Sequence, residues 1–496
     1  MTAAWAAGYL PGLLPRDVTW RTLAFGAATG AAGPIEIAVP VLDAAQMQAL
    51  AQRVRAASQQ HLKPMPVTAI IDVIDRAIAR LLDPQDPFRR EAEELLPRIT
   101  GYDPEMVRLA LTSYLKTFRA PQLHRFVAED FPNPKVLDEF QPAVKGGAVR
   151  AVGPQLLVHS WAGNVPALPL WSLVCGLLVK AGSVGKLPSA EPVFASLFAR
   201  LLAQVHPPWA DCLAVVWWQG GEAGPGAAAA AALYAQADTV LAYGSNAAVE
   251  QVRAQLPAST RFVPFGHKLG VALVGRCALD AQRGPATARL VAQDVARWEQ
   301  QGCYSPHVGY VERGGRIAPR EFAQYLAAEL ANLQQRYPRR APALADATEL
   351  ARWRQAAELR VLAGDGAELI GDEQAPWAVA YAERLLPLMP SAGGRCIQVV
   401  AVDALDEAVD GLAPHASFLQ TVGVATAPAR LYALAERLAG VGVTRIAALG
   451  AMASPEAGWH HDGGFNLLGL VRMVEIDQAA ERAAERLAPY AQEEGK

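Results

Sequence analysis

The spacing of hydrophobic residues along the chain changes character near residue 146. Between about residues 43 and 140, apolar residues recur at intervals of three and four, as in AIIDVIDRAIARLL and PEMVRLALTSYLKTF. This interval places the apolar side chains on one face of a helix. The sequence therefore predicts a helical opening segment.

After Gly146, short runs of strand-forming residues alternate with Ala- and Leu-rich stretches. Such alternation is typical of βαβ units around a parallel sheet. The first series of predicted strands covers residues 156–161, 184–188, 212–218, 239–244 and 261–265. The second covers 271–275, 308–312, 397–402, 418–426 and 445–450, with a long helical region predicted from about 318 to 390. The chain is therefore expected to adopt an α/β fold with two lobes.

The composition of the chain indicates which kinds of binding partner and which cellular compartment are expected. The 496 residues include 45 Lys and Arg against 48 Asp and Glu, so a polyanionic partner such as nucleic acid is not expected. The most apolar stretch, residues 165–179, is too short to cross a bilayer and contains two prolines, so no integral membrane segment is expected. Five cysteines without paired spacing predict neither a disulfide framework nor a zinc site. These features favour a reducing, cytoplasmic setting.

One cysteine differs from the other four in its context. Cys303 follows a polar stretch of helical spacing and precedes a predicted strand, which places its thiol on a connecting loop. Loops positioned by a rigid scaffold often carry reactive groups. The other four lie in or beside apolar runs and are predicted to be small core residues: Cys175, Cys212, Cys277 and Cys396. Cys303 is the candidate nucleophile, with a chance loop cysteine as the alternative.

Asn164 is the candidate partner of a reacting cysteine. A thiolate that accepts an acyl group needs hydrogen-bond donors for the oxyanion of its tetrahedral intermediate. Asn164 follows the predicted strand 156–161, so it is expected at the carboxyl edge of a parallel sheet, where α/β proteins bind ligands. The alternative is that Asn164 only caps the helix expected to begin near Pro166.

Two further strand ends could contact a nucleotide. Gly244 and Ser245 stand at a strand-to-helix junction, where backbone N–H groups attract phosphate. Lys186 and Ser189 end another strand, where an ammonium group could meet a ribose hydroxyl or a phosphate. Neither signal is specific when taken alone.

The stretch WHHDGGF (459–465) could suggest a metal site. Its histidines are sequential, however, and no supporting cluster of cysteines or carboxylates accompanies them. The expectation here is a polar, glycine-flanked loop lining a cleft, and no metal site.

The order of the motifs adds what the single motifs lack. SWAGNVP, VGKLPSAEP, YGSNAAVEQV, FGHKLGVALVG and EQQGCYSPHV resemble, in order and spacing, the motif series of the aldehyde dehydrogenase superfamily. The resemblance is strongest to its acyl-CoA reductase branch, the LuxC-type fatty-acid reductases of bacterial bioluminescence. It covers nearly the whole chain and includes ITGYDPEMVRLAL, SFLQTVGV and RIAALGAMASPEAGWHHDGGFNLLGLVRMVEID.

This resemblance implies an aldehyde dehydrogenase-like fold: two Rossmann-type three-layer α/β lobes with a helical N-terminal segment. It divides the chain into four parts. These are a mainly helical segment (1–145), a cofactor lobe (146–266), a catalytic lobe (267–450) and a C-terminal segment that returns to the cofactor lobe (451–496).

The resemblance also implies roles for single residues. Cys303 would hold an acyl group as a thioester, and Asn164 would stabilise the oxyanion with the Cys303 N–H. His267 and His307 are separate candidates for handling the proton in this mechanism, without support from a matching motif. The positions that match the superfamily's cofactor site are Ser160, Trp161, Lys186, Ser189, Gly244 and Ser245.

Three positions depart from the superfamily pattern. Pro264 stands where hydrolytic aldehyde dehydrogenases have a glutamate base, so water activation is not expected and an acyl-enzyme would be spared hydrolysis. Val249 replaces the second glycine of the turn near the pyrophosphate. The segment SAGGRCIQVV has no match for the glutamate that holds the nicotinamide ribose.

The expected activity is therefore reduction of an acyl thioester, acyl-CoA or acyl-protein and by resemblance fatty acyl, to an aldehyde. The resemblance implies NADPH as the cofactor, with NADH as an alternative, and an acyl-protein synthetase or transferase subunit as a partner. It leaves open whether the chain forms a homo-oligomer.

Three other activities compete with this reading. They are an NAD(P)-dependent aldehyde dehydrogenase, CoA-acylating or not, a cysteine-dependent acyltransferase or hydrolase without redox chemistry, and a non-catalytic docking subunit. The presence of both Cys303 and Asn164 disfavours the last of these.

Overall fold

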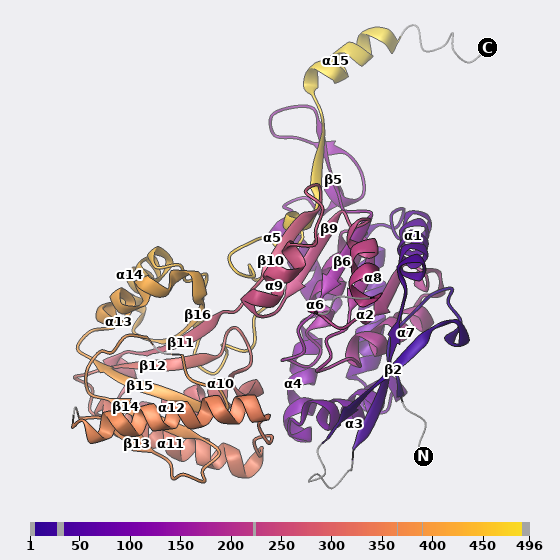
Figure 1. The fold of residues 1–496 in the computed structure, drawn as a ribbon. Coiled ribbons are helices and arrows are strands. Elements are labelled where there is room, and N and C mark those ends of the chain that lie inside the picture. Colours follow the sequence, from indigo (N-terminus) through magenta and orange to yellow (C-terminus); the bar gives the residue numbers. More distant parts are fainter. Residues whose placement is uncertain (1–4, 27–33, 222–224, 365, 389, 489–496) are drawn as a thin grey trace.

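The computed structural model describes residues 5–26, 34–221, 225–364, 366–388 and 390–488, and two large sheets organise them (Figure 1). The chain opens with a small three-stranded sheet in the order β1-β3-β2: β1 (Trp5–Ala6), β2 (Thr19–Phe25) and β3 (Ile35–Val41). Nothing in the hydrophobic spacing before residue 43 had predicted these strands. They lie beside the first large sheet, where Tyr9 bridges to Val215.

The predicted helical segment is confirmed. It consists of α1 (Ala44–His61), α2 (Val67–Leu82), α3 (Pro87–Thr100), α4 (Pro104–Lys116) and α5 (Ala120–Asp130). Aspartates begin three of these helices, because a carboxylate at the N-cap accepts hydrogen bonds from otherwise unpaired backbone N–H groups. Asp43 accepts from the Gln46 N–H in a capping box, and Asp86 and Asp103 cap α3 and α4.

The first large sheet contains five parallel strands in the order β10-β9-β6-β7-β8. The strands are β6 (Leu156–Ser160), β7 (Gly182–Lys186), β8 (Leu213–Val216), β9 (Thr239–Tyr243) and β10 (Arg261–Phe265), and the helices that connect them are α6 (Pro169–Leu178), α7 (Phe194–Val205), α8 (Pro225–Tyr234) and α9 (Asn246–Arg253). Leu156 packs in the core that contains α1 and α8, whereas Leu157 packs in the core that contains α2 and α7. Burial on both faces explains why these strands are continuous apolar runs.

The second large sheet has seven strands in the order β13-β14-β15-β12-β11-β16-β17. They are β11 (Leu269–Val274), β12 (Pro306–Glu312), β13 (Glu368–Ile370), β14 (Ala378–Ala382), β15 (Cys396–Val402), β16 (Leu419–Ala425) and β17 (Arg445–Ala448), with helices α10 (Arg283–Ala296), α11 (Pro319–Arg336), α12 (Leu344–Leu362), α13 (Leu405–Leu412) and α14 (Pro428–Gly440). The ten strands predicted for the two lobes are all present, with ends that agree to within two residues.

The prediction of one helical region from about 318 to 390 is wrong beyond Leu362. The chain forms β13 and β14 there, and β14 pairs in parallel with β15. All five residues of β14, AVAYA, are buried. A short apolar run that is buried on both faces lacks the alternation that identifies a strand, so periodicity alone does not separate it from a helix.

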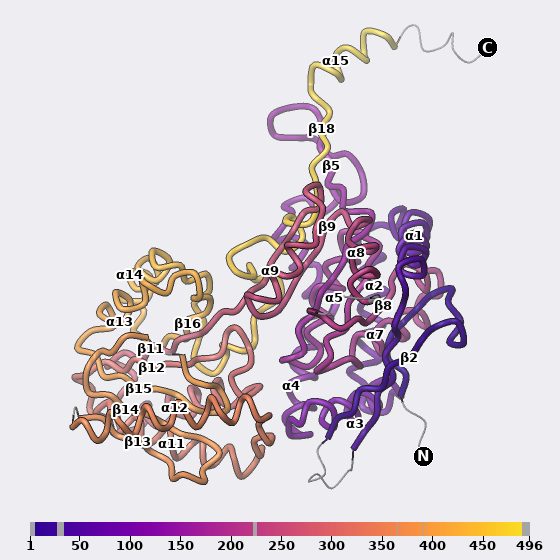
Figure 2. The backbone as a smooth tube through the Cα atoms, in the orientation of Figure 1, coloured from indigo at the N-terminus to yellow at the C-terminus, as the bar shows by residue number. Residues whose placement is uncertain are grey.

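A third sheet projects from the first lobe in the order β18-β5-β4, followed by α15 (Figure 1). It contains β4 (Gln141–Pro142), β5 (Ala148–Val152) and β18 (Arg472–Ile476), and α15 spans Gln478–Leu487 with no buried residue. Because β18 pairs antiparallel with β5, the chain must cross from the second sheet back to the first lobe after β17 (Figure 2). Residues 459–462 belong to this crossing segment between β17 and β18.

Across the described ranges, no helix combines the length and the apolar character needed to cross a bilayer.

Candidate active site

Cys303 lies where two cavities meet. It belongs to the loop between a short 3-10 turn, η5 (Arg297–Gln300), and β12, and its side chain is half-buried. Cys303 contributes to the wall of a chamber of about 480 Å³ and to the wall of a cleft of about 490 Å³. The two cavities also share Val165, Leu168, Tyr243, Tyr304 and His461. The prediction that Cys303 lies on a loop is confirmed.

The chamber is lined mainly by aromatic and apolar side chains. Tyr114 comes from α4, Trp171 from α6 and Trp459 from the crossing segment. Trp171 contacts both Trp459, with ring centroids 6.3 Å apart, and Phe126, at 5.2 Å. An apolar wall of this kind binds hydrocarbon by removing it from water.

The cleft on the other side of Cys303 is polar. Its wall includes Asn164, Ser245, His267, Gln420 and Asp462. The structure therefore brings together Cys303, Asn164 and His267, although Cys303 comes 139 positions after Asn164 in sequence.

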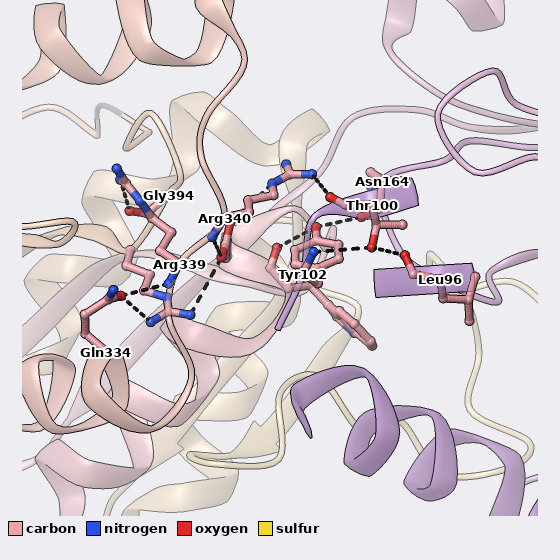
Figure 3. Close-up of polar contacts among 11 residues, drawn as sticks. Leu96, Thr100, Tyr102, Asn164, Gln334, Arg339, Arg340 and Gly394 are labelled. Atoms are coloured by element: carbon pink, nitrogen blue, oxygen red, sulfur yellow. Dashed lines mark hydrogen bonds and ion pairs between the residues drawn. The ribbon is translucent and has the colours of Figure 1, made fainter. Parts of the chain in front are cut away.

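A strained stretch of backbone precedes the cysteine. Trp298, Glu299 and Gln300 have φ angles of 50°, 50° and 64°, which side-chain-bearing residues rarely adopt. The buried Glu299 side chain accepts a hydrogen bond from the Arg340 N–H at 2.9 Å, and the Gly394 N–H donates to the Glu299 carbonyl at 3.0 Å (Figure 3). Such contacts hold a backbone conformation that would otherwise relax, and they fix where the following loop begins.

Tyr102 joins the loop of Asn164 to the loop of Cys303. Its hydroxyl lies 2.9 Å from the carbonyl oxygen of Asn164 and 3.2 Å from that of Trp298, and the Arg340 guanidinium lies 4.7 Å from the centre of its ring (Figure 3). The Asn164 amide also donates to the Gln301 carbonyl at 2.5 Å. The asparagine and the cysteine loops are therefore tied to each other directly.

The alternative role of Asn164 as a helix cap is wrong. The helix after it, α6, begins at Pro169, and its N-cap residue is Leu168. The three residues 165–167 separate Asn164 from that position, and Ala167 has a φ of 64°. Asn164 therefore points its amide to the Cys303 loop instead of the helix.

The Cys303 thiol is held in its protonated form at neutral pH. Burial raises its pKa to about 11, and the nearby Asp462 carboxylate adds to this shift. A hydrogen bond between the Gln420 side chain and the Cys303 sulfur acts in the opposite direction and lowers the pKa of the thiol. The Gln420 amide also donates to an Asp462 carboxylate oxygen at 2.6 Å. Gln420 therefore connects the thiol to the only acidic residue of the WHHDGGF stretch.

Three histidines line the cleft. His267 is exposed on the loop after β10, and its backbone N–H donates to the Asn246 side chain at 2.9 Å. His307 is buried beside the Ser391 hydroxyl at 2.9 Å, and burial lowers its pKa to about 4. His461 stacks on Phe265 at 4.3 Å, and burial lowers its pKa to about 4 as well. The prediction of a polar loop lining a cleft at 459–465 is confirmed by His461 and Asp462.

The candidate cofactor residues gather at the carboxyl edge of three adjacent strands. In the order β9-β6-β7, Gly244 and Ser245 follow β9, Ser160 ends β6 and Trp161 follows it, and Lys186 ends β7. From β6 the chain proceeds to β7 and β8 on one side, and then to β9 and β10 on the other. Ligands of open α/β sheets bind in the crevice at such a reversal of strand order.

Comparison with known proteins places this arrangement in a family. Residues 62–473 match the family model described as acyl-CoA reductase (LuxC). The chain belongs to the acyl-CoA reductase (LuxC) family. The long-chain acyl-protein thioester reductase of Vibrio harveyi is 23% identical over 428 residues, 85% of each chain. That of Photobacterium phosphoreum is 28% identical over 216 residues, so the match spans only 42% of that relative's length.

Solved structures show the fold of the family member. A putative methylmalonate-semialdehyde dehydrogenase from Sinorhizobium meliloti, complexed with NAD, is similar with a TM-score of 0.72 and 15% identity, covering 96% of this chain and 98% of that one. Aldehyde dehydrogenase 21 from Physcomitrella patens gives a TM-score of 0.70 at 14% identity, covering 96% and 99%. The expected aldehyde dehydrogenase-like α/β fold is thereby confirmed.

In this member of the acyl-CoA reductase family, three candidate cofactor residues at the carboxyl ends of the strands have side chains that contact neighbouring residues. The Lys186 ammonium lies 5.6 Å from the centre of the Trp218 ring, and burial lowers its pKa. The Ser189 hydroxyl accepts a hydrogen bond from the Trp217 indole at 3.1 Å. Ser245 caps α9 by accepting from the Ala248 N–H at 3.3 Å. Each of these side chains already has a local contact.

Two of the candidate cofactor residues are buried. Ser160 is 7% exposed, and Trp161 is 3% exposed with its indole donating to the Ser172 hydroxyl at 2.8 Å. The Trp161 ring fills the space above Gly185, where a Cβ atom would lie 1.7 Å from it. Trp161 therefore offers only its backbone to a ligand at the sheet edge.

The sorting of the cysteines needs one correction. Cys175, Cys212 and Cys396 are buried as predicted, but Cys277 is half-exposed. It follows β11, which ends at Val274, and lies in a short 3-10 turn over Arg276–Ala278. An apolar strand thus does not guarantee burial for the residue three positions beyond it.

Two site residues were not singled out from the sequence, Tyr102 and Gln420, and Asp462 was expected only as part of a polar loop lining a cleft. Gln420 did carry a signal, because it is a polar residue within the apolar run of β16 and is only 1% exposed. A buried polar side chain in a strand needs a partner, and here the partners are Asp462 and Cys303. In the described part of the chain, no group of three or more His, Cys, Asp or Glu is placed to hold a metal ion.

Proposed function

We propose that this chain reduces an acyl thioester to an aldehyde through a thioester formed on Cys303. The observation that carries the proposal is the position of Cys303 at the junction of an apolar chamber and a polar cleft, with Asn164 beside it. The names of the relatives in Vibrio harveyi and Photobacterium phosphoreum support an acyl thioester as the substrate.

In the first step, the Cys303 sulfur attacks the thioester carbonyl of the substrate. The carbonyl oxygen becomes an oxyanion, which Asn164 and a backbone N–H of the cysteine loop stabilise. The carrier sulfur then leaves and takes up the proton that Cys303 has lost. The acyl group is now joined to Cys303, with its hydrocarbon in the chamber.

A nicotinamide cofactor at the edge formed by β9, β6 and β7 would supply the hydride that reduces the acyl carbonyl. The chain's own residues then complete the reaction: Cys303 is the leaving group, it regains a proton, and the aldehyde departs through the chamber. The apolar wall keeps water away from the thioester. Pro264 also protects the thioester from hydrolysis. It provides no base to activate water at the position where hydrolytic aldehyde dehydrogenases are expected to have a glutamate.

We infer that NADPH is the preferred cofactor, and two residues near the strand ends support this. An acid near the end of the second strand commonly binds the ribose hydroxyl of NAD, whereas a cation accommodates the phosphate of NADP. Glu191, the acid nearest this strand end, is 1% exposed and accepts hydrogen bonds from the N–H groups of Val193 and Phe194 at 2.9 and 2.8 Å. Lys186 is the cation at the strand end.

The proposal is tested by supplying acyl-CoAs of increasing chain length with NADPH or NADH and measuring the aldehyde produced. Aldehyde formation with NADPH, at lower rates with NADH, is the expected result. Cofactor reduction with aldehyde and no CoA, and no reaction in the acyl-CoA direction, would instead identify an aldehyde dehydrogenase. Acyl transfer without any cofactor consumption would identify an acyltransferase.

Acylation of Cys303 is expected to accelerate with pH. Because burial raises the pKa of its thiol to about 11, the thiolate fraction should rise about tenfold for each pH unit below that value. The rate of adduct formation from radiolabelled acyl-CoA, measured without cofactor, should therefore keep rising from pH 7 to pH 9. A plateau below pH 8 would contradict this, since it would require a thiolate formed at much lower pH.

A further inference from the structure

Three buried polar side chains stand together in the wall of the polar cleft: Gln300, His307 and Ser391. They come from separate segments of the second lobe. Gln300 ends the strained turn η5, His307 lies in β12, and Ser391 lies in the loop before β15. Buried polar atoms almost always have hydrogen-bond partners, so an atom of this group that lacks one marks a place for a ligand.

His307 carries one free hydrogen-bond acceptor. Its Nδ1 atom lies 3.2 Å from the Ser391 carbonyl oxygen and 2.9 Å from the Ser391 hydroxyl. Because a carbonyl oxygen can only accept, the ring proton belongs on Nδ1, and burial keeps the ring neutral. The other nitrogen, Nε2, then keeps its lone pair, and no residue that the structure describes forms a hydrogen bond with it.

Gln300 carries a second free acceptor. Its amide nitrogen donates to the carbonyl oxygens of Pro306 at 2.8 Å and Cys396 at 2.9 Å. These two carbonyls fix which end of the amide is the nitrogen. The amide oxygen, Oε1, is buried and has no partner in the described part of the chain. The Ser391 hydroxyl lies 3.3 Å from the Gln300 amide nitrogen and also contacts His307, so both acceptors belong to one group.

The same cleft joins the candidate cofactor edge to the candidate nucleophile. Gly244 and Ser245 line it at the end of β9, and Cys303 lines it next to Gln300 and His307. A dinucleotide with its pyrophosphate at the end of β9 and its nicotinamide at Cys303 has one ribose between these two points, because that ribose links them covalently. Its two hydroxyl groups need acceptors once they leave water.

We propose that His307 Nε2 and Gln300 Oε1 accept hydrogen bonds from the hydroxyl groups of the nicotinamide ribose. This inference rests on the proposed function, and it names the residues that hold the reactive half of the cofactor. It also separates His307 from the handling of the proton. A neutral ring that is protonated on Nδ1 has no proton on Nε2 to donate.

The test isolates the ribose from the rest of the cofactor. 2′-Phospho-ADP ends at the pyrophosphate, whereas 2′-phospho-ADP-ribose adds the ribose and still lacks the nicotinamide. Calorimetric titration of the wild type should give a Kd about tenfold lower for the second ligand, as expected for hydrogen bonds to two neutral acceptors. In His307→Phe this ratio should fall to about threefold, with the Kd for 2′-phospho-ADP unchanged, which shows that the variant is folded.

His307→Gln is the rescue variant, because its amide oxygen can take the place of Nε2. It should restore part of the tenfold ratio. Retention of the full ratio in His307→Phe would overturn the ribose site, as would equal Kd values for the two ligands in a wild type that binds NADPH.

Asp346→Asn is the matched control. Asp346 is exposed and lines the same cleft, so its carboxylate is the competing acceptor for ribose hydroxyls. Its replacement should leave the ratio of the two Kd values unchanged, and loss of the ratio in this variant would overturn the assignment to His307. Failure of the proposed function is recognised separately, because neither NADPH nor NADH would then quench the fluorescence of the 11 tryptophans. That outcome would overturn both proposals.

Discussion

Cys303→Ala is expected to abolish both the covalent acyl adduct and aldehyde production. Incubation with radiolabelled acyl-CoA in the absence of cofactor should label the wild type through a bond that hydroxylamine cleaves, because hydroxylamine attacks thioesters. Among the described residues that line both chamber and cleft, Cys303 alone carries a sulfur atom, and the variant lacks it. Loss of a nucleophile that forms a covalent intermediate commonly lowers turnover by about 10⁴-fold or more.

The matched control is Cys277→Ala. Cys277 is the other cysteine that is not buried, so it would be the alternative source of non-specific labelling. Its replacement should leave both labelling and turnover at the wild-type level. Equal labelling of the Cys303→Ala variant and the wild type would falsify the proposed intermediate.

Asn164→Ala should lower kcat by about 10² to 10³, with a much smaller effect on KM. Removal of one oxyanion donor has an effect of this size because the hydrogen bond strengthens as charge develops on the oxygen. The measurement is steady-state aldehyde production over a range of acyl-CoA concentrations. A rise in KM with unchanged kcat would show that Asn164 binds the substrate and does not stabilise the transition state.

Tyr102→Phe is the companion variant for Asn164. It leaves the amide in place but removes the hydroxyl that lies near the carbonyls of Asn164 and Trp298. We expect a smaller decrease in kcat, because the amide is still present but less well positioned. A variant as inactive as Asn164→Ala would mean that the placement of the loop accounts for the whole effect.

Much of the fold could be predicted from the chain because its signals are local. Apolar intervals of three and four identify helices such as α2, and aspartates identify where α3 and α4 begin. The strands of both lobes are recognisable as short apolar runs between helices. Strand β14 was missed because it lacks such a local signal. It is buried on both faces, so its residues do not alternate between apolar and polar.

The candidate site was predictable only in part. Cys303 differed from the other cysteines because it was predicted to lie on a loop. The resemblance of the motif series to that of the aldehyde dehydrogenase superfamily then linked Cys303 with Asn164 and with the residues at the strand ends. The contributions of Tyr102, Gln420 and Asp462 depend on contacts between segments that are far apart in the sequence. No local pattern encodes which backbone carbonyl a tyrosine hydroxyl will reach.

The sequence by itself determined the α/β class, the helical opening and a reactive cysteine on a loop, because each depends on near neighbours in the chain. Only the tertiary structure decided where Cys303 lies relative to an apolar chamber and a polar cleft. It also decided that its thiol is neutral at pH 7, since burial and the Asp462 carboxylate come from packing. Burial and distance are properties of residues brought together by folding, and no stretch of sequence contains them.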